Sequence, residues 1–459
     1  MVDIPPEIWL HILQFLPKEE LYRLISVNRL FLEVGMNSKW ESVELSNKVL
    51  DSHLPSTMQT LKRLSDPFVA SKLKILNIEI TVTYNDTTDV TDIDNPTELI
   101  KFPTFDELIN GIVQAAPHFK NVTNVDLTCW NLSPSCNPEI LRSIWFPMSQ
   151  SLKVLSLAGS LGAFRVLIES LPPMPQLDEL RLLFMEDYTL DEGGQLAVLI
   201  THVVPFINSI GPRLKLLSIY SWTNVDLSVV FKNLHTPPAL RELAISFFFN
   251  VSLAEPPQLN RFLKRCSDTV VNLGLSLQVD WDTSDVSGQR RDEWLMDLFS
   301  ADNQCLMNLE DLNISLRTVK DHAVDILAAC LQKTQKTLQE LCVRDRYLNS
   351  GEFSRVLDAA ANCMQLNCLW INIDRVDWDV IEMLAPKLPR IRRLFIVTPA
   401  LAILSSERGP DEMSTHYPTA TAQLLEHRVC KHLQWKLHVA ELWEDGGGRL
   451  KIENMLTTA

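Results

Sequence analysis

The chain has 459 residues and a formal net charge of −15, and 46% of its residues are hydrophobic. The acidic balance argues against nucleic-acid binding, which needs basic side chains to replace the counterions on phosphates, and against an anionic membrane surface. No run of about 18 or more apolar residues predicts a transmembrane helix, and the chain does not open with a basic and then apolar leader. The nine cysteines form no Cys-x-x-Cys pair, which favours reduced thiols in the cytoplasm and/or nucleus. We therefore expect no nucleic-acid partner and no membrane partner.

Residues 1–46 predict a small helical module. Pro5 and Pro6 suit the first turn of a helix, because proline lacks the N–H group that has no partner there. Pro17 ends this helix, since proline is excluded from a helix interior. A second helix is expected over residues 18–28, and a third segment, residues 29–32, leads into a polar stretch.

The first predicted helix carries two apolar stripes. A unit of about 40 residues buries a low share of its surface and cannot hide both stripes within itself. The second stripe is expected to pack on the rest of the chain or, as a large apolar patch in water, to face a partner protein. The first stripe consists of Ile8, Ile12, Phe15 and Leu16, and the second of Trp9 and Leu13, widened by Leu10.

The order and spacing of these residues resemble an F-box of the fungal type. Two positions depart from that family's pattern, with Ile4 in place of Leu and Asn28 in place of the frequent Cys. The resemblance implies that the module binds a Skp-type adaptor, which tethers the chain to a cullin–RING ubiquitin ligase. The matching residues are Ile4-Pro5-Pro6-Glu7-Ile8, Ile12-Leu13, Leu16-Pro17, Leu21, Leu24, Val27-Asn28-Arg29 and Trp40. The candidates for the adaptor interface, or for the small core behind it, are Pro5, Ile8, Ile12, Leu13, Leu16, Leu21, Leu24 and Val27.

Beyond residue 70, the pattern apolar-x-x-apolar-x-apolar recurs, mostly at intervals of roughly 25 to 39 residues, a spacing that indicates a solenoid. Between the copies the apolar period becomes helical, so each unit predicts a strand, a loop and a helix. Neither element can bury its apolar face alone, and stacked units would form a parallel sheet. The copies are Leu73-Leu76-Ile78, Val122-Val125-Leu127, Leu152-Leu155-Leu157, Leu177-Leu180-Leu182, Leu214-Leu217-Ile219, Leu240-Leu243-Ile245, Val270-Leu273-Leu275, Leu309-Leu312-Ile314, Leu338-Leu341-Val343, Leu366-Leu369-Ile371 and Ile391-Leu394-Ile396.

This pattern resembles a leucine-rich-repeat array in the irregular form that is often joined to an F-box. The Asn or Cys that normally follows the strand in that family is absent, and Ser160, Trp222 and Arg346 stand at its position in three units. The loops must therefore satisfy their backbone groups in another way. The fold class expected is α/β, an irregular leucine-rich-repeat-like solenoid after the helical module, with a less regular α/β fold as the alternative.

The predicted domains are an F-box-like helical module over residues 1–46, a helical linker over 47–69, the solenoid over 70–404, and a terminal loop, helix and tail over 405–459. Two polar stretches, residues 85–98 and 280–293, are expected to be solvated insertions in the array, with recognition loops as the alternative.

Enzyme signatures are largely missing from the sequence. It contains no Gly-x-x-x-x-Gly-Lys-Ser/Thr loop and no His-Glu-x-x-His. Residues 158–162 place Ser160 between a strand and a helix, as in a hydrolase nucleophile elbow. Ala158 stands where that motif has its first glycine, and neighbouring units carry nothing similar. We expect no catalytic, metal-binding or cofactor-binding residues.

Aromatic residues directly after the strands either fill the core or act as binding anchors, since Trp and Tyr dominate binding hot spots. Phe247, Phe248 and Phe249 cannot all point inward from an extended strand, because side chains alternate between its faces. Trp222 and Phe248 are the candidates for contact with an unknown protein substrate. The expected function is the substrate-recognition subunit of a Skp–cullin–F-box type ubiquitin ligase, and the alternative is a protein-binding scaffold outside the ligase. The remaining aromatic residues of this kind are Trp130, Phe184 and Tyr220.

Overall fold

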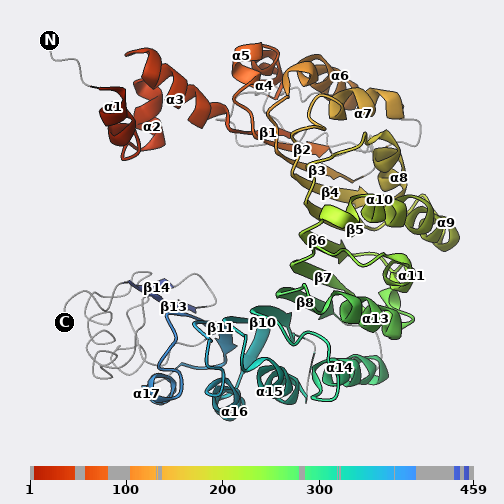
Figure 1. Ribbon diagram of the computed structural model, residues 1–459, viewed down its shortest axis with the longest axis vertical. Helices are drawn as coiled ribbons and strands as arrows, with labels where there is room; N and C mark the ends of the chain where they lie inside the picture. The colour runs from red at the N-terminus through yellow and green to blue at the C-terminus, as the bar shows by residue number, and fades with distance from the viewer. Residues whose placement is uncertain are drawn as a thin grey trace, which may run out of the picture. The chain divides into compact units, whose positions relative to one another are not determined.

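The computed structural model describes residues 5–46, 57–80, 104–130, 132, 137–278, 285–317, 319, 322–376, 378–399, 439–444 and 449–453. The chain divides into two compact units, unit 1 (Met1–Leu214) and unit 2 (Lys215–Ala459). In each unit helices cover one face of a sheet whose strands follow one another in chain order (Figure 1).

Three helices open unit 1: α1 (Pro6–Leu13), α2 (Lys18–Arg23) and α3 (Arg29–Trp40). The side-chain oxygen of Asn28 accepts a hydrogen bond from the backbone N–H of Phe31 at 2.9 Å, and this cap starts α3. The extended backbone of Asn28 prevents α2 from reaching residue 28 as predicted, and α2 ends at Arg23. The polar stretch before residue 40 forms the second half of α3.

The remainder of unit 1 alternates helices with parallel strands, from β1 to β5. The elements are β1 (Ser42–Ser46), α4 (Thr57–Leu64), α5 (Pro67–Ala70), β2 (Ile75–Ile80), α6 (Phe105–Ala115), η1 (Ala116–His118), β3 (Asn124–Cys129), α7 (Pro138–Trp145), β4 (Val154–Ser160), α8 (Leu161–Ser170), β5 (Glu179–Met185), α9 (Glu192–Val198), η2 (Leu199–Val203), α10 (Val204–Ile210) and η3 (Gly211–Arg213).

The sheet of unit 1 begins with β1, a strand that the sequence analysis missed. It pairs in parallel with β2, and Val43 and Leu45 are buried on the side that α4 covers. The spacing Trp40-x-x-Val43-x-Leu45 fits the apolar pattern and would have revealed this strand. Helix α4 also packs on α6, so residues 57–64 of the predicted linker contribute to the helical layer of unit 1. The predicted domain boundaries themselves stay a prediction.

Unit 2 continues the same alternation. Its strands β6 to β13 pair in parallel, and β14 runs antiparallel to β13. The elements are β6 (Leu216–Ser221), α11 (Ser228–Asn233), β7 (Glu242–Phe248), α12 (Phe249–Ser252), α13 (Pro256–Cys266), β8 (Asn272–Gln278), α14 (Asp285–Phe299), β9 (Asp311–Ser315), α15 (Ala323–Thr334), β10 (Glu340–Leu348), α16 (Ser350–Ala360), β11 (Cys368–Ile373), α17 (Trp378–Lys387), β12 (Arg393–Thr398), β13 (Val439–Glu444) and β14 (Arg449–Glu453).

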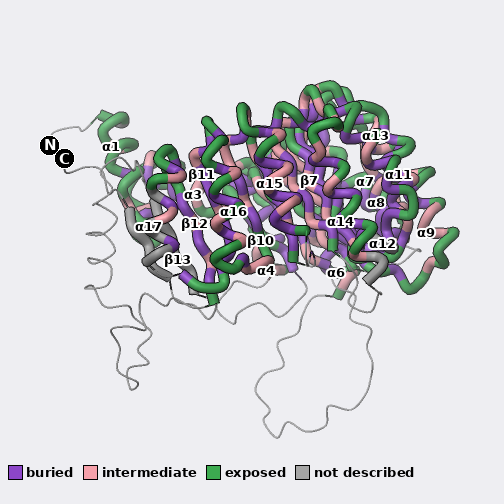
Figure 2. The backbone as a smooth tube through the Cα atoms, turned by 90° about the horizontal axis from the view of Figure 1, so that it is seen from below, coloured by how far each residue is buried: buried purple, intermediate pink, exposed green. Residues whose placement is uncertain are grey.

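The repeated apolar pattern coincides with one strand per copy, from β2 to β12. Its second and third apolar residues, such as Leu312 and Ile314 on β9, are buried against the helices. The residues between them face away from the helices, so burial alternates along the strands (Figure 2). The predicted fold class, an α/β solenoid of the leucine-rich-repeat kind, is confirmed.

In the loop after β6, other side chains form the hydrogen bonds to backbone groups that the missing Asn or Cys would form. Trp222, which holds that position, is exposed, and its neighbours take over the role. The backbone N–H of Thr223 donates to Ser221 Oγ at 3.2 Å, and Ser252 Oγ donates to the carbonyl of Thr223 at 2.8 Å. Short hydroxyl side chains from two neighbouring repeats thus pair the polar groups of this buried turn.

At the other two substituted positions, Ser160 and Arg346 form hydrogen bonds of their own, each of a different kind. Ser160 caps α8, because its Oγ accepts a hydrogen bond from the backbone N–H of Ala163 at 3.3 Å. Arg346 donates to the carbonyl of Val319 in the preceding repeat and pairs with Glu352 at 2.7 Å. Each loop therefore has its own solution, which explains why the repeat looks irregular in the sequence.

The predicted insertion over residues 280–293 is wrong from Asp285 onward, where α14 begins and packs against α15. Arg291 is fully buried, and its guanidinium donates to the carboxylate of Asp292 at 2.6 and 2.9 Å. Trp294 and Leu298, four residues apart on one face, are also buried. The charged residues misled the prediction because this ion pair allows them to enter a packed helix.

Within the predicted terminal loop, helix and tail, the structure has two strands, β13 and β14, which extend the sheet of unit 2. The rest of that segment, the predicted terminal helix and the predicted insertion over residues 85–98 lie outside the described residues.

One described stretch, Glu192–Arg213, is long and apolar enough to cross a membrane by length and composition alone. Its side chains Leu199, Val203 and Ile207 are buried, and the stretch packs on α8 within unit 1. A helix that covers a repeat sheet carries an apolar face, and the buried third of this apolar window serves that packing.

Candidate functional site

The N-terminal helices form their own small core. Leu13, Leu21 and Phe31 are buried in it, and Leu16 and Leu24 pack half-buried against it. The ring of Trp9 meets that of Phe31 edge-on, with the centroids 5.4 Å apart. The stripe of Trp9 and Leu13, which was expected to face a partner or the rest of the chain, therefore packs inside the module.

Three of the four residues of the first stripe are exposed instead, whereas the fourth, Leu16, packs on the core. Leu10, which widens the second stripe, is exposed as well. Ile8, Ile12 and Phe15 follow one another along one side of the first helix and its terminal turn, and we call these three residues the N-terminal apolar surface. Pro5 and Val27 are also exposed, but Val27 lies beyond α2. Of the adaptor-binding candidates, Pro5, Ile8, Ile12 and Val27 are accessible, whereas Leu13 and Leu21 serve the core. Phe15, which the candidate set left out, is the most exposed of the large apolar side chains on α1 and its terminal turn.

A second candidate site lies on the sheet of unit 2, on the face opposite the helices. Here a cavity of about 550 Å³, the sheet-face cavity, extends across strands β6 to β11. Its size lies in the range of ligand-binding clefts. The side chains that line it on the exposed face are Tyr220, Glu242, Ala244, Ser246, Asn272, Gly274, Ser276, Asp311, Asn313, Ser315, Glu340, Cys342, Arg344, Asp345, Cys368 and Trp370.

Three carboxylates of the cavity share one register row, which we call the acidic row: Glu242, Asp311 and Glu340. Asn272 lies between the first two in the parallel register, and Asp311 lies directly opposite Glu340. With its amide nitrogen turned toward Asp311, Asn272 donates to that carboxylate at 2.9 Å. Parallel pairing in register thus collects like charges that are far apart in the sequence.

Partial burial of the Asp311 carboxyl raises its pKa to about 6, and repulsion by Glu340, Glu310 and Glu242 adds to this effect. Arg393 opposes this effect, and its guanidinium pairs with Glu340. Among the described residues, the salt bridge of the acidic row joins Glu340 to Arg393, so the excess negative charge lies at the end that holds Asp311 and Glu242.

The other end of the cavity is aromatic. The rings of Trp370 and Phe395 stack with centroids 5.0 Å apart, and the guanidinium of Arg344 lies 5.1 Å from the Trp370 ring. Strand β10 has a register irregularity between Val343 and Tyr347. Within it, Asp345 has a φ of 65° and accepts a hydrogen bond from Ser315 Oγ at 3.1 Å. Arg344 faces the cavity by the regular alternation of β10, in register with Ser315, and the bulge adds Asp345 to the same face.

The sequence-predicted anchors lie outside this cavity. Trp222 is exposed and Phe248 is half-buried. Tyr220 and Ser246 are register partners, and Trp222 and Phe248 each follow one of them by two residues. Phe247 is buried against Phe231, and Phe249 begins α12, so the run of three phenylalanines divides between core and surface. Among the other aromatics, Phe184 is buried and Trp130 is exposed.

The acidic row was missed, although the sequence carries a signal for it. Glu242, Asp311 and Glu340 each immediately precede the second apolar residue of a repeat copy. Comparing the polar positions of successive copies, rather than the apolar ones alone, would have shown carboxylates recurring at this position. Their proximity then follows from in-register parallel pairing.

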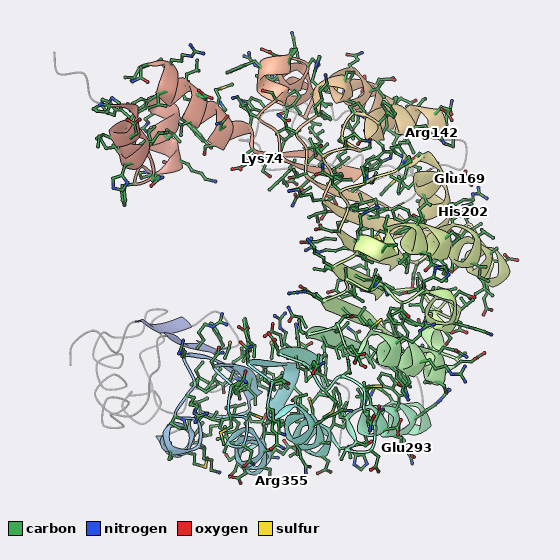
Figure 3. The ribbon with its side chains drawn as sticks, viewed as in Figure 1. Lys74, Arg142, Glu169, His202, Glu293 and Arg355 are labelled. Atoms are coloured by element: carbon green, nitrogen blue, oxygen red, sulfur yellow. The ribbon has the colours of Figure 1, made fainter. Side chains whose placement is uncertain are left out.

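The residues considered for chemistry have structural roles where the structure describes them. Ser160 is buried and caps α8. His202 Nδ1 lies 3.7 Å from Glu169 Oε1, and Figure 3 shows the two side chains beside each other on the helical side of unit 1. Six of the seven cysteines in the described ranges are buried, and burial raises the pKa of Cys330 to about 12. Those ranges contain no group of three His, Cys, Asp or Glu that could hold a metal ion.

Comparisons with known proteins do not assign the chain to a family. No family model and no curated protein matches it. The structure of the leucine-rich-repeat protein LegL7 from Legionella pneumophila is 14% identical over 85% of this chain and 98% of that one, with a TM-score of 0.40. The structure of the Rad7 and Elc1 complex in yeast is 14% identical over 88% of this chain and 94% of that one, also with a TM-score of 0.40. The assignment of the fold therefore depends on the chain's own strands: they define a leucine-rich-repeat-like α/β solenoid protein.

Proposed function

We propose that this chain is the substrate-recognition subunit of a Skp–cullin–F-box type ubiquitin ligase in the cytoplasm or nucleus. The N-terminal module binds the Skp-type adaptor, and the repeat units hold a protein substrate. The chain itself contributes no catalytic group. Its effect is to raise the local concentration of the substrate near the ubiquitin-charged enzyme that the cullin–RING partners supply.

The observation that supports the adaptor contact is the division of apolar residues in the module. Leu13, Leu21 and Phe31 are enough to form its core, while Ile8, Ile12 and Phe15 stay in water on one side of α1. Neighbouring large apolar side chains left in water mark a contact surface for another protein. The F-box resemblance indicates what that protein is.

The test is capture of a purified Skp-type adaptor by the full chain. A double variant, Ile12→Asp with Phe15→Asp, places carboxylates on the N-terminal apolar surface without touching the buried core. Burial of an unpaired carboxylate in an apolar contact is strongly unfavourable, so the variant should lose capture. Leu16 is avoided because it packs on the core, and its replacement could unfold the module.

The chain offers a matched control for this variant. Ile140 and Phe146, at α7 of unit 1, are 40% and 68% exposed, close to the 39% of Ile12 and the 74% of Phe15. Ile140→Asp with Phe146→Asp introduces the same charges at similar exposure outside the module, and capture should persist. Failure of the unmodified chain to capture the adaptor, or equal loss in both variants, would contradict the proposal.

A protein-binding scaffold outside the ligase is the second candidate. It is favoured by the sheet-face cavity, which lies entirely in unit 2 and contains no residue of the N-terminal module. A chain that fails to capture the adaptor but still binds a partner through unit 2 would support this candidate.

A further inference from the structure

The floor of the sheet-face cavity is built from small residues. Ala244 and Gly274 are register partners on β7 and β8, and so are Ser246 and Ser276. Because these four side chains are short, they leave an open volume between Tyr220 on β6 and Trp370 on β11. The hollow is thus a consequence of residue choice on two adjacent central strands.

The charge of the cavity is strongly one-sided. Its lining includes four carboxylates, from Glu242, Asp311, Glu340 and Asp345, and one guanidinium, from Arg344. That guanidinium is already engaged over the ring of Trp370. An anionic ligand would meet like charge here, and a purely apolar segment would strip water from the carboxylates without replacing it.

The spacing of the acidic row fits an extended polypeptide. Glu242 and Asp311 lie two strands apart in register, which is about 10 Å at the usual distance between strands. In the extended polyproline II conformation, with three residues per turn and a rise of about 3.1 Å per residue, side chains three residues apart lie on the same side of the chain, about 9 Å apart. A segment that crosses the strands can therefore place two basic side chains on these two carboxylates.

We propose that the sheet-face cavity of unit 2 binds a basic polypeptide segment, with lysine or arginine side chains three residues apart on Glu242 and Asp311. Charge complementarity selects the segment, and the small floor provides room for its backbone. The inference depends on the proposed function only in taking this segment to belong to the ligase substrate. The binding itself needs no adaptor.

The test uses the full chain without any adaptor and a fluorescein-labelled peptide, Gly-Ser-Lys-Gly-Ser-Arg-Gly-Ser. A neutral peptide with Gln in place of Lys and Arg is the reference. Fluorescence polarisation should show saturable binding of the basic peptide and none of the neutral one. Absence of binding up to about 1 mM peptide, a very weak affinity, would overturn the proposal.

Two variants separate shape from charge. Gly274→Leu fills the hollow and leaves every charge in place; a Cβ at Gly274 would lie 3.4 Å from the Cβ of Ala244, an ordinary contact. Glu242→Gln with Asp311→Asn removes charge and keeps the shape. Each should weaken peptide binding about tenfold or more. Unchanged binding by the filled variant would show that the peptide is held elsewhere on the acidic chain.

The charge control is Asp268→Asn with Asp302→Asn, two exposed residues of unit 2 that do not line the cavity. It alters the net charge equally and should bind the peptide as the unmodified chain does. Loss of binding in this control to the same extent would mean non-specific attraction and overturn the proposal.

Cys342 supplies a second readout, because its half-exposed thiol lines the cavity. Saturating basic peptide should slow its alkylation by N-ethylmaleimide, measured by mass spectrometry of its tryptic peptide, and the neutral peptide should not. These experiments and the adaptor capture can fail independently, so the two proposals remain distinguishable.

Discussion

Asp311 on β9 lies directly opposite Glu340 on β10 in the parallel register, so two like charges face each other across one strand pair. Glu340 is paired with Arg393 on the other side, whereas Asp311 bears the repulsion and is partly buried. Surfaces where like charges lower the stability of the fold are often binding sites, because a ligand of opposite charge removes the repulsion.

The pKa of Asp311, raised from 3.8 to about 6, predicts how stability depends on pH. The folded state holds the Asp311 proton more tightly than the unfolded state, so stability falls as pH rises from about 4 to about 6 and stays lower above. Asp311→Asn carries no charge at any pH. The variant should exceed the unmodified chain in unfolding free energy at pH 7.5 by about 1 kcal/mol, a value reduced for partial exposure.

Urea unfolding followed by circular dichroism between pH 4 and pH 8 measures this difference. The gain should shrink toward pH 4, because the Asp311 carboxyl of the folded chain is then protonated and no longer carries a charge that its surroundings disfavour. A gain that is constant over the range would contradict the raised pKa of Asp311 in the folded chain. Asp268→Asn, at an exposed position outside the cavity, serves as the control.

The N-terminal module should separate core residues from contact residues by stability. Leu21→Ala removes a buried side chain and should destabilise the module by about 2–4 kcal/mol, whereas Ile12→Ala on the exposed stripe should change it by less than about 0.5 kcal/mol. Hydrogen exchange of the amides of α1 to α3 in the full chain measures both. Equal effects of the two variants would contradict the division between core and N-terminal apolar surface.

Ser160 should matter for stability only. Ser160→Ala removes the cap of α8 and should cost about 1 kcal/mol in unfolding free energy, measured by urea unfolding. Binding of the basic peptide should not change. If the variant kept full stability, the cap would not be the role of this side chain.

Replacement of Arg346 by lysine should lower the stability of the chain. Its guanidinium serves both the carbonyl of Val319 and the carboxylate of Glu352, and an ammonium lacks the fork that reaches both. Arg346→Lys should cost about 1–2 kcal/mol and speed hydrogen exchange at the start of α16.

The control for this prediction is Arg355→Lys. Arg355 pairs with Asp325 at 2.6 Å, but both side chains are largely exposed, and Arg355 lies on the outer side of the helices (Figure 3). An exposed pair contributes less than about 1 kcal/mol, so little change is expected. A similar loss in both variants would contradict the special role of Arg346.

The sequence by itself determined the repeat architecture. The strands β2 to β12 coincide with the apolar pattern because burial of every second side chain against the helices is a local, periodic requirement. It also determined the start of α1 at Pro6, since proline acts through its own backbone. The predicted stop at Pro17 was wrong, because α1 ends at Leu13 and Pro17 instead precedes the first residue of α2. The sequence could not separate Leu13 and Leu21 from Ile8 and Ile12, because both sets are apolar and only packing against Phe31 distinguishes them.

Only the tertiary structure decided the acidic row and the cavity. Glu242, Asp311 and Glu340 come from three repeats, and their proximity depends on the register in which those repeats stack. Likewise, the polar composition of residues 285–293 predicted an insertion, but these residues form part of α14, because Asp292 pairs with the buried Arg291. Contacts between residues distant in the chain set both outcomes, and a local pattern carries no information about such contacts until the strands are paired.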